Sequence, residues 1–329
     1  MSLAPSLFGL GPEPALEIWD CRSDMSRRER EGFIWILLAA AGFSVMPAMV
    51  KITYLHSTLE PMDIAVWRFI LAVPMMWAMV IYRRRSASPS RKSDAPVKKA
   101  LLIGLMLSAA VLAAFFALQR LPASTYIVLF YTYPAIVVLL SVMLGERIGY
   151  RAWLALAMAL TGVMLTVPDF SGLSTGDLFG VVLVLGNAAI VAVYYILSKR
   201  ALNGVADMSG SSAWMMLGTL LVMLLLVPFR GLQLPQNPQT LLTLVGIATL
   251  GTVLPVFAIN IAIQQIGAAR ASLVSTVEPP LSMIVSVIIL GEAVFAIQWL
   301  GAALIIGSVL VLQFRPRNRI DVSIAHEAG

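Results

Sequence analysis

One acidic residue lies in the middle of an apolar stretch near the C-terminal end of the sequence. Glu278 directly precedes Pro279-Pro280 inside the segment 271–290. A charged side chain at the centre of a membrane helix costs about 2.5–3.5 kcal/mol on insertion scales, so it usually faces a cavity or a partner. The prolines lack amide hydrogens and favour a kink at the same place. Glu278 is therefore a candidate proton carrier or amine-binding group, and a buried carboxyl that supports the kink is the structural alternative.

A second apolar segment presents tyrosines around one proline. Tyr126, Tyr131 and Tyr133 precede Pro134, and Tyr133 stands beside its proline as Glu278 stands before its own pair. Tyrosines at this spacing can line a pocket that stacks a ring or binds a carboxylate. Aromatic packing between helices is an equally common use of such rings, and both interpretations stay open.

Amide and hydroxyl side chains mark three further apolar segments. Asn187 lies at the centre of its segment, with Tyr194 and Tyr195 two turns later. Asn260 lies one turn before Gln264, and Ser44 lies near a proline. A polar side chain inside a helical bundle either bonds a neighbouring helix or contacts a ligand. We expect a ligand contact for Asn187, an interhelical bond for Asn260, and a hydroxyl from Ser44 in the same central cavity.

These considerations give two sets of candidate residues. The substrate-binding candidates are Glu278, Tyr133, Asn187, Ser44, Tyr194, Asn260 and Tyr131. The candidates for helix ends and gates are Glu146, Glu292, Pro134 and Pro280. The two glutamates follow glycines, so they are expected to terminate helices and to close gates, with a role as topological markers as the alternative.

Arg68 is a second charge within an apolar segment. Asp63 precedes it by five residues, which is imperfect spacing for a pair on one helix. We expect a structural ion pair between these two residues, or a contact of Arg68 with lipid headgroups.

Several chemistries find no support in the sequence. Cys21 is the only cysteine and His56 and His326 are the only histidines, so no disulfide and no metal cluster is expected. The sequence contains no HExxH motif and no GxxxxGK[ST] phosphate-binding loop, and Asp169 and Asp177 flank a loop. We expect no cofactor and no enzymatic activity, with an intramembrane enzyme as a minor alternative.

The composition requires a lipid environment for most of the chain. Hydrophobic residues make up 59% of the 329 positions and charged residues 12%, against roughly 45–50% and 25% in soluble domains. A span needs about 20 mostly apolar residues. Ten segments meet this test: 33–50, 64–82, 100–118, 124–144, 150–167, 178–197, 212–227, 241–263, 271–290 and 294–313.

The positive charges predict the orientation. The net charge of +6 comes from basic residues between apolar segments, which favours lipid headgroups over a nucleic-acid partner. With both termini in the cytoplasm, the inner side holds 27–30, 83–99, Arg147, Arg151, Lys199, Arg200, Arg270 and 315–319, and the outer side holds Lys51, Arg120 and Arg230. We expect cytoplasmic tails at 1–32 and 315–329, with Met25 as an alternative start.

The sequence contains an internal repeat. Pro134, Leu144-Gly145-Glu146 and Trp153-Leu154 recur with identical spacing as Pro280, Leu290-Gly291-Glu292 and Trp299-Leu300, and Lys51 corresponds to Lys199. A half with five helices inserts with the opposite orientation to its partner, so the repeat is inverted. The fold class expected is an all-α polytopic membrane protein of ten transmembrane helices in two inverted five-helix repeats. Such repeats exchange shapes to open each side of the membrane in turn.

The two repeated motifs resemble those of a known family. FYTYPAIVVLLSVMLGE (130–146) and STVEPPLSMIVSVIILGE (275–292) are similar to the EamA family of the drug/metabolite transporter superfamily. The resemblance implies a first repeat over 33–167 and a second over 168–314, and a secondary transporter of small molecules in the bacterial inner membrane. Export of aromatic or neutral amino acids is the leading substrate assignment. A carrier for a cofactor or drug and a channel-like facilitator are the alternatives, and a homodimer is left open.

Overall fold

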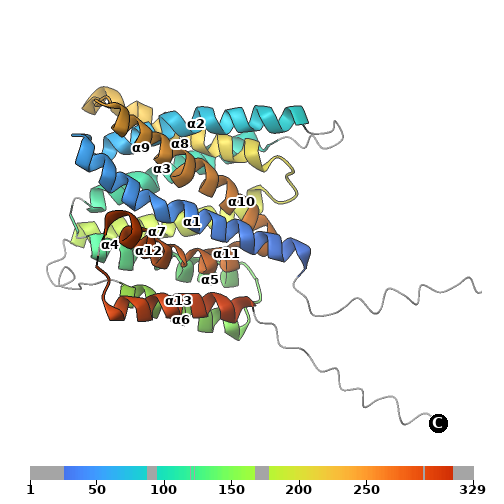
Figure 1. Cartoon of the computed structure of the whole chain (residues 1–329). Coiled ribbons are helices and arrows are strands. Elements are labelled where there is room, and N and C mark those ends of the chain that lie inside the picture. The colour runs from blue at the N-terminus through green and yellow to red at the C-terminus, as the bar shows by residue number, and fades with distance from the viewer. Residues whose placement is uncertain are drawn as a thin grey trace, which may run out of the picture.

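The computed structural model describes residues 26–86, 95–118, 120–121, 123–166, 178–291 and 293–313, and every regular element within these ranges is a helix. In the first part of the chain the helices are α1 (Arg27–His56), α2 (Pro61–Ser86), α3 (Val97–Leu118), α4 (Ala123–Phe130), α5 (Tyr133–Met143) and α6 (Tyr150–Thr166). In the second part they are α7 (Leu178–Ala201), α8 (Met208–Arg230), α9 (Pro238–Ala248), the π-helix η3 (Thr249–Val253), α10 (Leu254–Ile266), α11 (Ala268–Ser275), α12 (Glu278–Leu290) and α13 (Ala296–Gln313). Figure 1 shows them as a bundle of extended, roughly side-by-side rods.

The helices account for ten membrane crossings. Eight helical stretches are long and apolar enough to span, and α6 and α13 are shorter apolar helices. Three of the eight stretches join consecutive elements: α4 with α5, α9 with η3 and α10, and α11 with α12. The predicted fold class is therefore confirmed.

The first span begins six residues before the predicted position 33. Ser26 is the N-cap of α1, its hydroxyl accepts a hydrogen bond from the Glu29 amide, and the Glu29 carboxylate accepts one from the Ser26 amide. This capping box satisfies amide groups that the first turn leaves without partners. Residues 27–32 of the predicted tail are thus helical. The rest of that tail and the C-terminal tail lie outside the described residues.

The packing follows the internal repeat. The first helix of one repeat, α1, packs against α10 and α12, and the first helix of the other, α7, packs against α3 and α5. The second helices, α2 and α8, pack against each other, and so do the fifth helices, α6 and α13. Each repeat therefore receives the first helix of the other, as expected for two related halves that share one core.

Glycines permit the closest contact between the fifth helices. A Cβ atom on Gly162 of α6 would lie 2.7 Å from the Gly301 carbonyl oxygen, and one on Gly301 of α13 would lie 2.6 Å from the Gly162 carbonyl oxygen. Small residues let helix backbones approach closely within a membrane. Any larger side chain at either position would push α6 and α13 apart.

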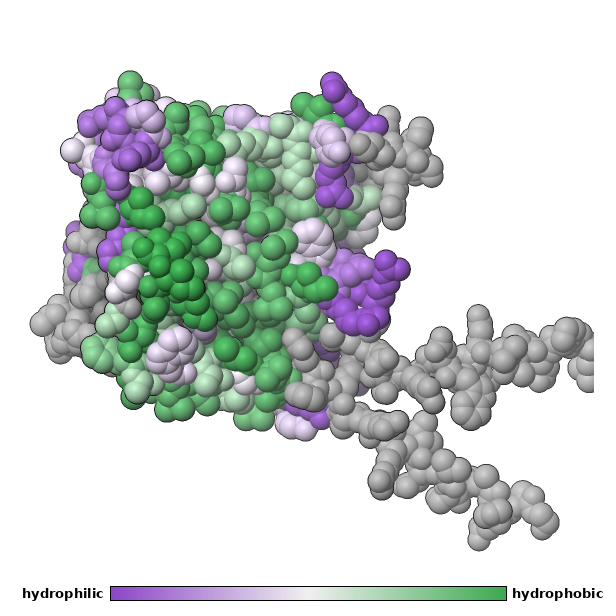
Figure 2. All heavy atoms as spheres, viewed as in Figure 1, coloured by the Kyte–Doolittle hydropathy of each residue, from purple (hydrophilic) through white to green (hydrophobic). Residues whose placement is uncertain are grey.

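The bundle has two polar ends and an apolar belt. We call the end at which α1, α3, α6, α8 and α11 begin the basic end, because α2 finishes there with Arg83-Arg84-Arg85. Figure 2 shows green apolar side chains over most of the visible face and purple hydrophilic ones towards its left and right margins. This distribution matches an apolar belt in lipid between two wet ends.

Candidate functional site

Two of the crossings are broken into half-helices. The α4–α5 span breaks at Tyr131-Thr132, and the α11–α12 span breaks at Thr276-Val277. Proline is favoured in the first turn of a helix, where its missing amide hydrogen is not needed. Pro134 and Pro280 lie in the first turns of α5 and α12, so each marks a new half-helix rather than a simple kink.

The breaks place a tyrosine at the start of one half-helix and a glutamate at the start of the other. Tyr133 is the first residue of α5, and Glu278 is the first residue of α12. Short turns partly satisfy the backbone at both breaks, because the Thr132 amide donates to the Leu129 carbonyl at 3.2 Å and the Thr276 amide donates to the Leu273 carbonyl at 3.3 Å. Half-helix N-termini at mid-membrane are a recurring way of building transporter binding sites.

Glu278 faces one hydroxyl and one cation. Its electrostatic partners are the Tyr131 hydroxyl, as a hydrogen-bonding group, and the Arg68 guanidinium. Tyr131 is buried, whereas Glu278 and Arg68 each keep part of their surface accessible. Glu278 and Arg68 therefore lie in the same interior region of the bundle.

Arg68 is anchored on the π-helix rather than on Asp63. Its Nε donates to the Thr252 hydroxyl at 2.6 Å, and its Nη2 donates to the Gly251 carbonyl at 3.4 Å. The Asp63 carboxylate instead accepts the Glu60 amide at 3.0 Å, at the start of α2. The predicted Asp63–Arg68 ion pair is therefore wrong, because Asp63 bonds the start of its own helix and Arg68 bonds the π-helix.

An aromatic cluster joins the two repeats beside Glu278. The ring centroids of Tyr131 and Tyr133 are 5.9 Å apart, and those of Tyr133 and Tyr195 are 5.7 Å apart. The Tyr195 hydroxyl lies 2.7 Å from the Ser275 hydroxyl, at the end of α11. The cluster thus links the break in one repeat to the break in the other through α7.

The other candidate side chains form hydrogen bonds with neighbouring helices or within their own helix. Asn187 Nδ2 donates to the Tyr126 hydroxyl at 2.7 Å, and the ligand contact expected for Asn187 stays a prediction. The Asn260 side chain accepts from the Tyr194 hydroxyl at 2.9 Å and donates to a serine of α8, which is the interhelical bond expected for it. The Ser44 hydroxyl donates to a carbonyl of its own helix, one turn earlier.

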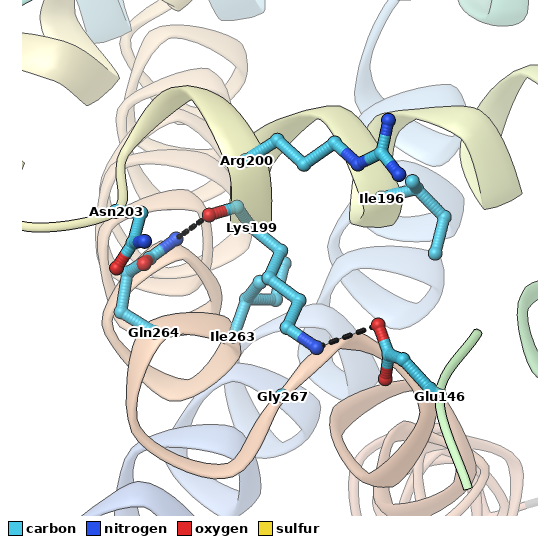
Figure 3. A pocket seen from close by; sticks show the side chains of 8 residues that line it. All are labelled: Glu146, Ile196, Lys199, Arg200, Asn203, Ile263, Gln264 and Gly267. Atoms are coloured by element: carbon cyan, nitrogen blue, oxygen red, sulfur yellow. Dashed lines mark hydrogen bonds and ion pairs between the residues drawn. The ribbon is translucent and has the colours of Figure 1, made fainter. Parts of the chain in front are cut away.

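An ion pair joins the two repeats at the basic end. Lys199 Nζ, near the end of α7, lies 2.7 Å from Glu146 Oε1, just after α5 (Figure 3). Glu146 follows Gly145, whose φ of +85° favours glycine, and Gly291 in the other repeat has a φ of +66°. The repeated glycine therefore makes a similar left-handed turn in both halves. Glu292 itself lies outside the described residues.

Three residues at this site are not among the binding candidates expected from the sequence: Arg68, Tyr195 and Thr252. Arg68 is a charge within a span, and the cost of burying such a charge favours a cavity or partner for it as much as for Glu278. Tyr195 directly follows the candidate Tyr194, and the two side chains lie on different faces of α7. Nothing in the sequence indicates a role for Thr252, since its contact with Arg68 depends on the π-helix. Among the described residues, no group of three or more His, Cys, Asp or Glu side chains is placed to hold a metal ion.

Comparisons with known proteins agree with this architecture. The chain is similar to an uncharacterized transporter of Archaeoglobus fulgidus (strain ATCC 49558 / DSM 4304 / JCM 9628 / NBRC 100126 / VC-16), with 25% identity over 59% of this chain and 68% of that protein. It is similar to the uncharacterized transporter YdfC of Bacillus subtilis (strain 168), with 26% identity over 55% of this chain and 59% of that protein. It also resembles the uncharacterized inner membrane transporter YedA of Escherichia coli (strain K12), with 22% identity over 77% of this chain and 81% of that protein.

A solved crystal structure shares the fold. It superposes with a TM-score of 0.72 at 20% sequence identity, covering 88% of this chain and 97% of the other. Two copies of the EamA-like transporter domain match residues 30–167 and 178–314, which include both broken helices and both glycine turns. The chain therefore belongs to the EamA-like transporter family of multi-pass membrane transporters.

Proposed function

We propose that this transporter is a secondary carrier that works by alternating access and exports amino acids with aromatic or other neutral side chains. The observation that carries the proposal is the shared region of Glu278 and Arg68, bordered by tyrosine rings. An amino acid brings an ammonium group and a carboxylate on one carbon. In this site the acid is complementary to the ammonium group, the guanidinium to the carboxylate, and the aromatic wall to the side chain.

Each group in this region has a distinct task in the proposal. The Glu278 carboxylate receives the ammonium group or exchanges a proton for it. The Arg68 guanidinium uses two of its five N–H donors on Thr252 and Gly251, which fixes its plane, and the remaining donors face a substrate carboxylate. The rings of Tyr131, Tyr133 and Tyr195 supply an apolar surface with hydroxyl groups at its edge.

The arrangement of the repeats supports alternating access. Each first helix packs inside the other repeat, so a relative movement of the halves changes both ends at once. The Glu146–Lys199 ion pair crosses between repeats at the basic end and has to separate before that end opens. In the proposal the basic end is cytoplasmic, as the positive-inside rule requires, and the membrane is the bacterial inner membrane.

Counterflow in proteoliposomes tests the proposal. Purified protein is reconstituted with unlabelled tyrosine inside, and uptake of labelled tyrosine is followed. We expect saturable uptake that internal tyrosine accelerates. Flux that never saturates and shows no trans-stimulation would indicate a pore. Saturable exchange of a cofactor or drug, with none of any amino acid, would keep the carrier and overturn the substrate class.

A matched variant pair makes this experiment specific. Glu278→Gln removes the charge at the proposed site and is expected to abolish counterflow. Glu60→Gln removes the carboxylate that pairs with Arg230 at the end opposite the basic end, and is expected to leave counterflow intact. Equal effects of the two substitutions would contradict the placement of the site.

A further inference from the structure

A cavity at the basic end lies outside the region around Glu278. It has a volume of about 390 Å³ and opens between the α5–α6 connection and the α10–α11 junction. Its polar lining consists of Glu146, Arg147, Tyr150, Arg151, Lys199 and Arg270. A second cavity of about 280 Å³ shares Glu146, Lys199 and Gly267 with it and is shown in Figure 3.

The lining of the larger cavity is strongly cationic. It carries four basic side chains and a single carboxylate, that of Glu146, which already bonds Lys199 at 2.7 Å. Arg270 also pairs with Glu29 at 3.0 Å, which fixes its guanidinium at the cavity edge. Cations gathered in one hollow at a membrane boundary attract an anionic group.

The same cavity has an apolar component. Ile148, Ile266 and Leu312 contribute to the lining, and Tyr150 at its rim is 73% exposed. Tyrosine is enriched at the level of lipid headgroups, where its ring lies in the apolar phase and its hydroxyl in water. A free phosphate ion would use only the cations, whereas a phospholipid would use the cations and the apolar wall together.

We infer that this cavity binds the headgroup of an anionic phospholipid. The phosphate lies among Arg147, Arg151 and Arg270, and the start of the acyl chains lies along the apolar wall. Basic pockets between transmembrane helices are a recognised form of lipid site. The inference concerns binding alone and does not depend on the transported substrate.

Native mass spectrometry of the purified protein tests this inference. The protein is reconstituted into nanodiscs that contain equal amounts of phosphatidylglycerol and phosphatidylcholine. It is then released gently, and the lipid that stays bound to it is identified. We expect one phosphatidylglycerol to stay bound to the wild type. In the double variant Arg147→Gln, Arg151→Gln, we expect its retention to fall about 30-fold, since each cation near an anionic surface contributes a factor of about five.

The control removes two cations at the same end that line neither cavity. Arg85 and Lys98 are exposed at the end of α2 and the start of α3. The double variant Arg85→Gln, Lys98→Gln is expected to retain phosphatidylglycerol as the wild type does. Equal retention by both double variants, or equal loss from both, would overturn the inference.

A competition experiment separates a lipid site from a phosphate site. Inorganic phosphate in large excess is added before release, and displacement of phosphatidylglycerol is measured. We expect the lipid to remain, because phosphate cannot replace its contacts with the apolar wall. Full displacement would show a site for the phosphate ion alone. None of these measurements involves transport, so their failure would leave the proposed function untouched, and failed counterflow would leave this site untouched.

Discussion

The two broken helices share a backbone design and differ in chemistry. The break before α5 presents Tyr131 and Tyr133, and the break before α12 presents Glu278. Both half-helices begin with proline in the first turn, and both are followed by a glycine with positive φ. The two repeats therefore keep the same backbone break while the side chains next to it differ, with tyrosines at one break and a carboxylate at the other.

The largest effect is expected from removing the charge that distinguishes the second break. Glu278→Gln should lower kcat/KM for counterflow by at least about 100-fold, because it leaves Arg68 without its interior counter-charge. Retained thermal stability would show that the variant folds. Wild-type transport should also vary between roughly pH 5.5 and 8 if the carboxyl exchanges a proton. If Glu278→Gln transports as fast as the wild type at every pH in that range, the proton role is ruled out.

Arg68 tests whether the second charge recognises the substrate or only balances Glu278. Arg68→Gln should weaken counterflow of an amino acid by about tenfold to 100-fold, the value of a charge-assisted hydrogen bond. The matching amine that lacks a carboxylate should be affected much less. Arg68→Lys should restore part of the activity, because it keeps the charge and loses the planar fork. Equal losses for both compounds would mean that Arg68 serves the fold alone.

Two adjacent tyrosines sharpen the comparison further. Tyr195 contacts Ser275 next to the second break, and Tyr194 bonds Asn260 away from it. Each change to phenylalanine should cost about 1 kcal/mol of stability, visible as a similar fall in Tm. Only Tyr195→Phe should raise KM for counterflow. A rise of the same size in Tyr194→Phe would extend the site to the Asn260 side of α7.

The smallest effect concerns the start of the second helix of the second repeat. Burial alone would raise the pKa of Asp207, but hydrogen bonds from the Gly210 amide and the Arg84 guanidinium outweigh it and hold the pKa below its ordinary value of 3.8. A lowered pKa in the folded state means that the stabilisation is complete above pH 3.8 and disappears as the pH falls through the folded value. Tm should therefore fall in acid.

The neutral variant isolates this contribution. Asp207→Asn keeps an N-cap side chain for α8 and loses the ion pair with Arg84, whose side chain is about half exposed. We expect a loss of less than about 1 kcal/mol at neutral pH. The difference in Tm between the two proteins should shrink below pH 3.8. A constant difference at all pH values would show that the charge of Asp207 does not matter.

Most of the fold could be predicted from the sequence because apolar length is a local property. All ten predicted spans correspond to crossings in the structure, and the motif around Pro134 and Pro280 marked the broken helices. The early start of α1 was missed because the capping box at Ser26 adds a polar first turn outside the apolar stretch. Hydropathy alone does not register such a turn.

The site was predicted less completely because its contacts join distant parts of the chain. Arg68 bonds Thr252 across 184 positions, and this contact depends on the π-helix that precedes Pro255. A π-helix arises from tertiary packing as much as from local sequence, so nothing in the spacing of residues 249–253 indicated it. Glu278, Tyr131 and Tyr133 were found because a charge or a proline beside an aromatic residue is conspicuous in an apolar segment.

The close crossing of α6 and α13 has a consequence for how the protein is made. Gly162 is synthesised well before its partner Gly301, because α7 to α12 lie between them along the chain. We therefore expect the first repeat to stay in the bilayer with one helix face uncovered until α13 is inserted. We expect a chain that stops before Ala296 to insert normally and yet to be removed by membrane quality control as an unfinished protein.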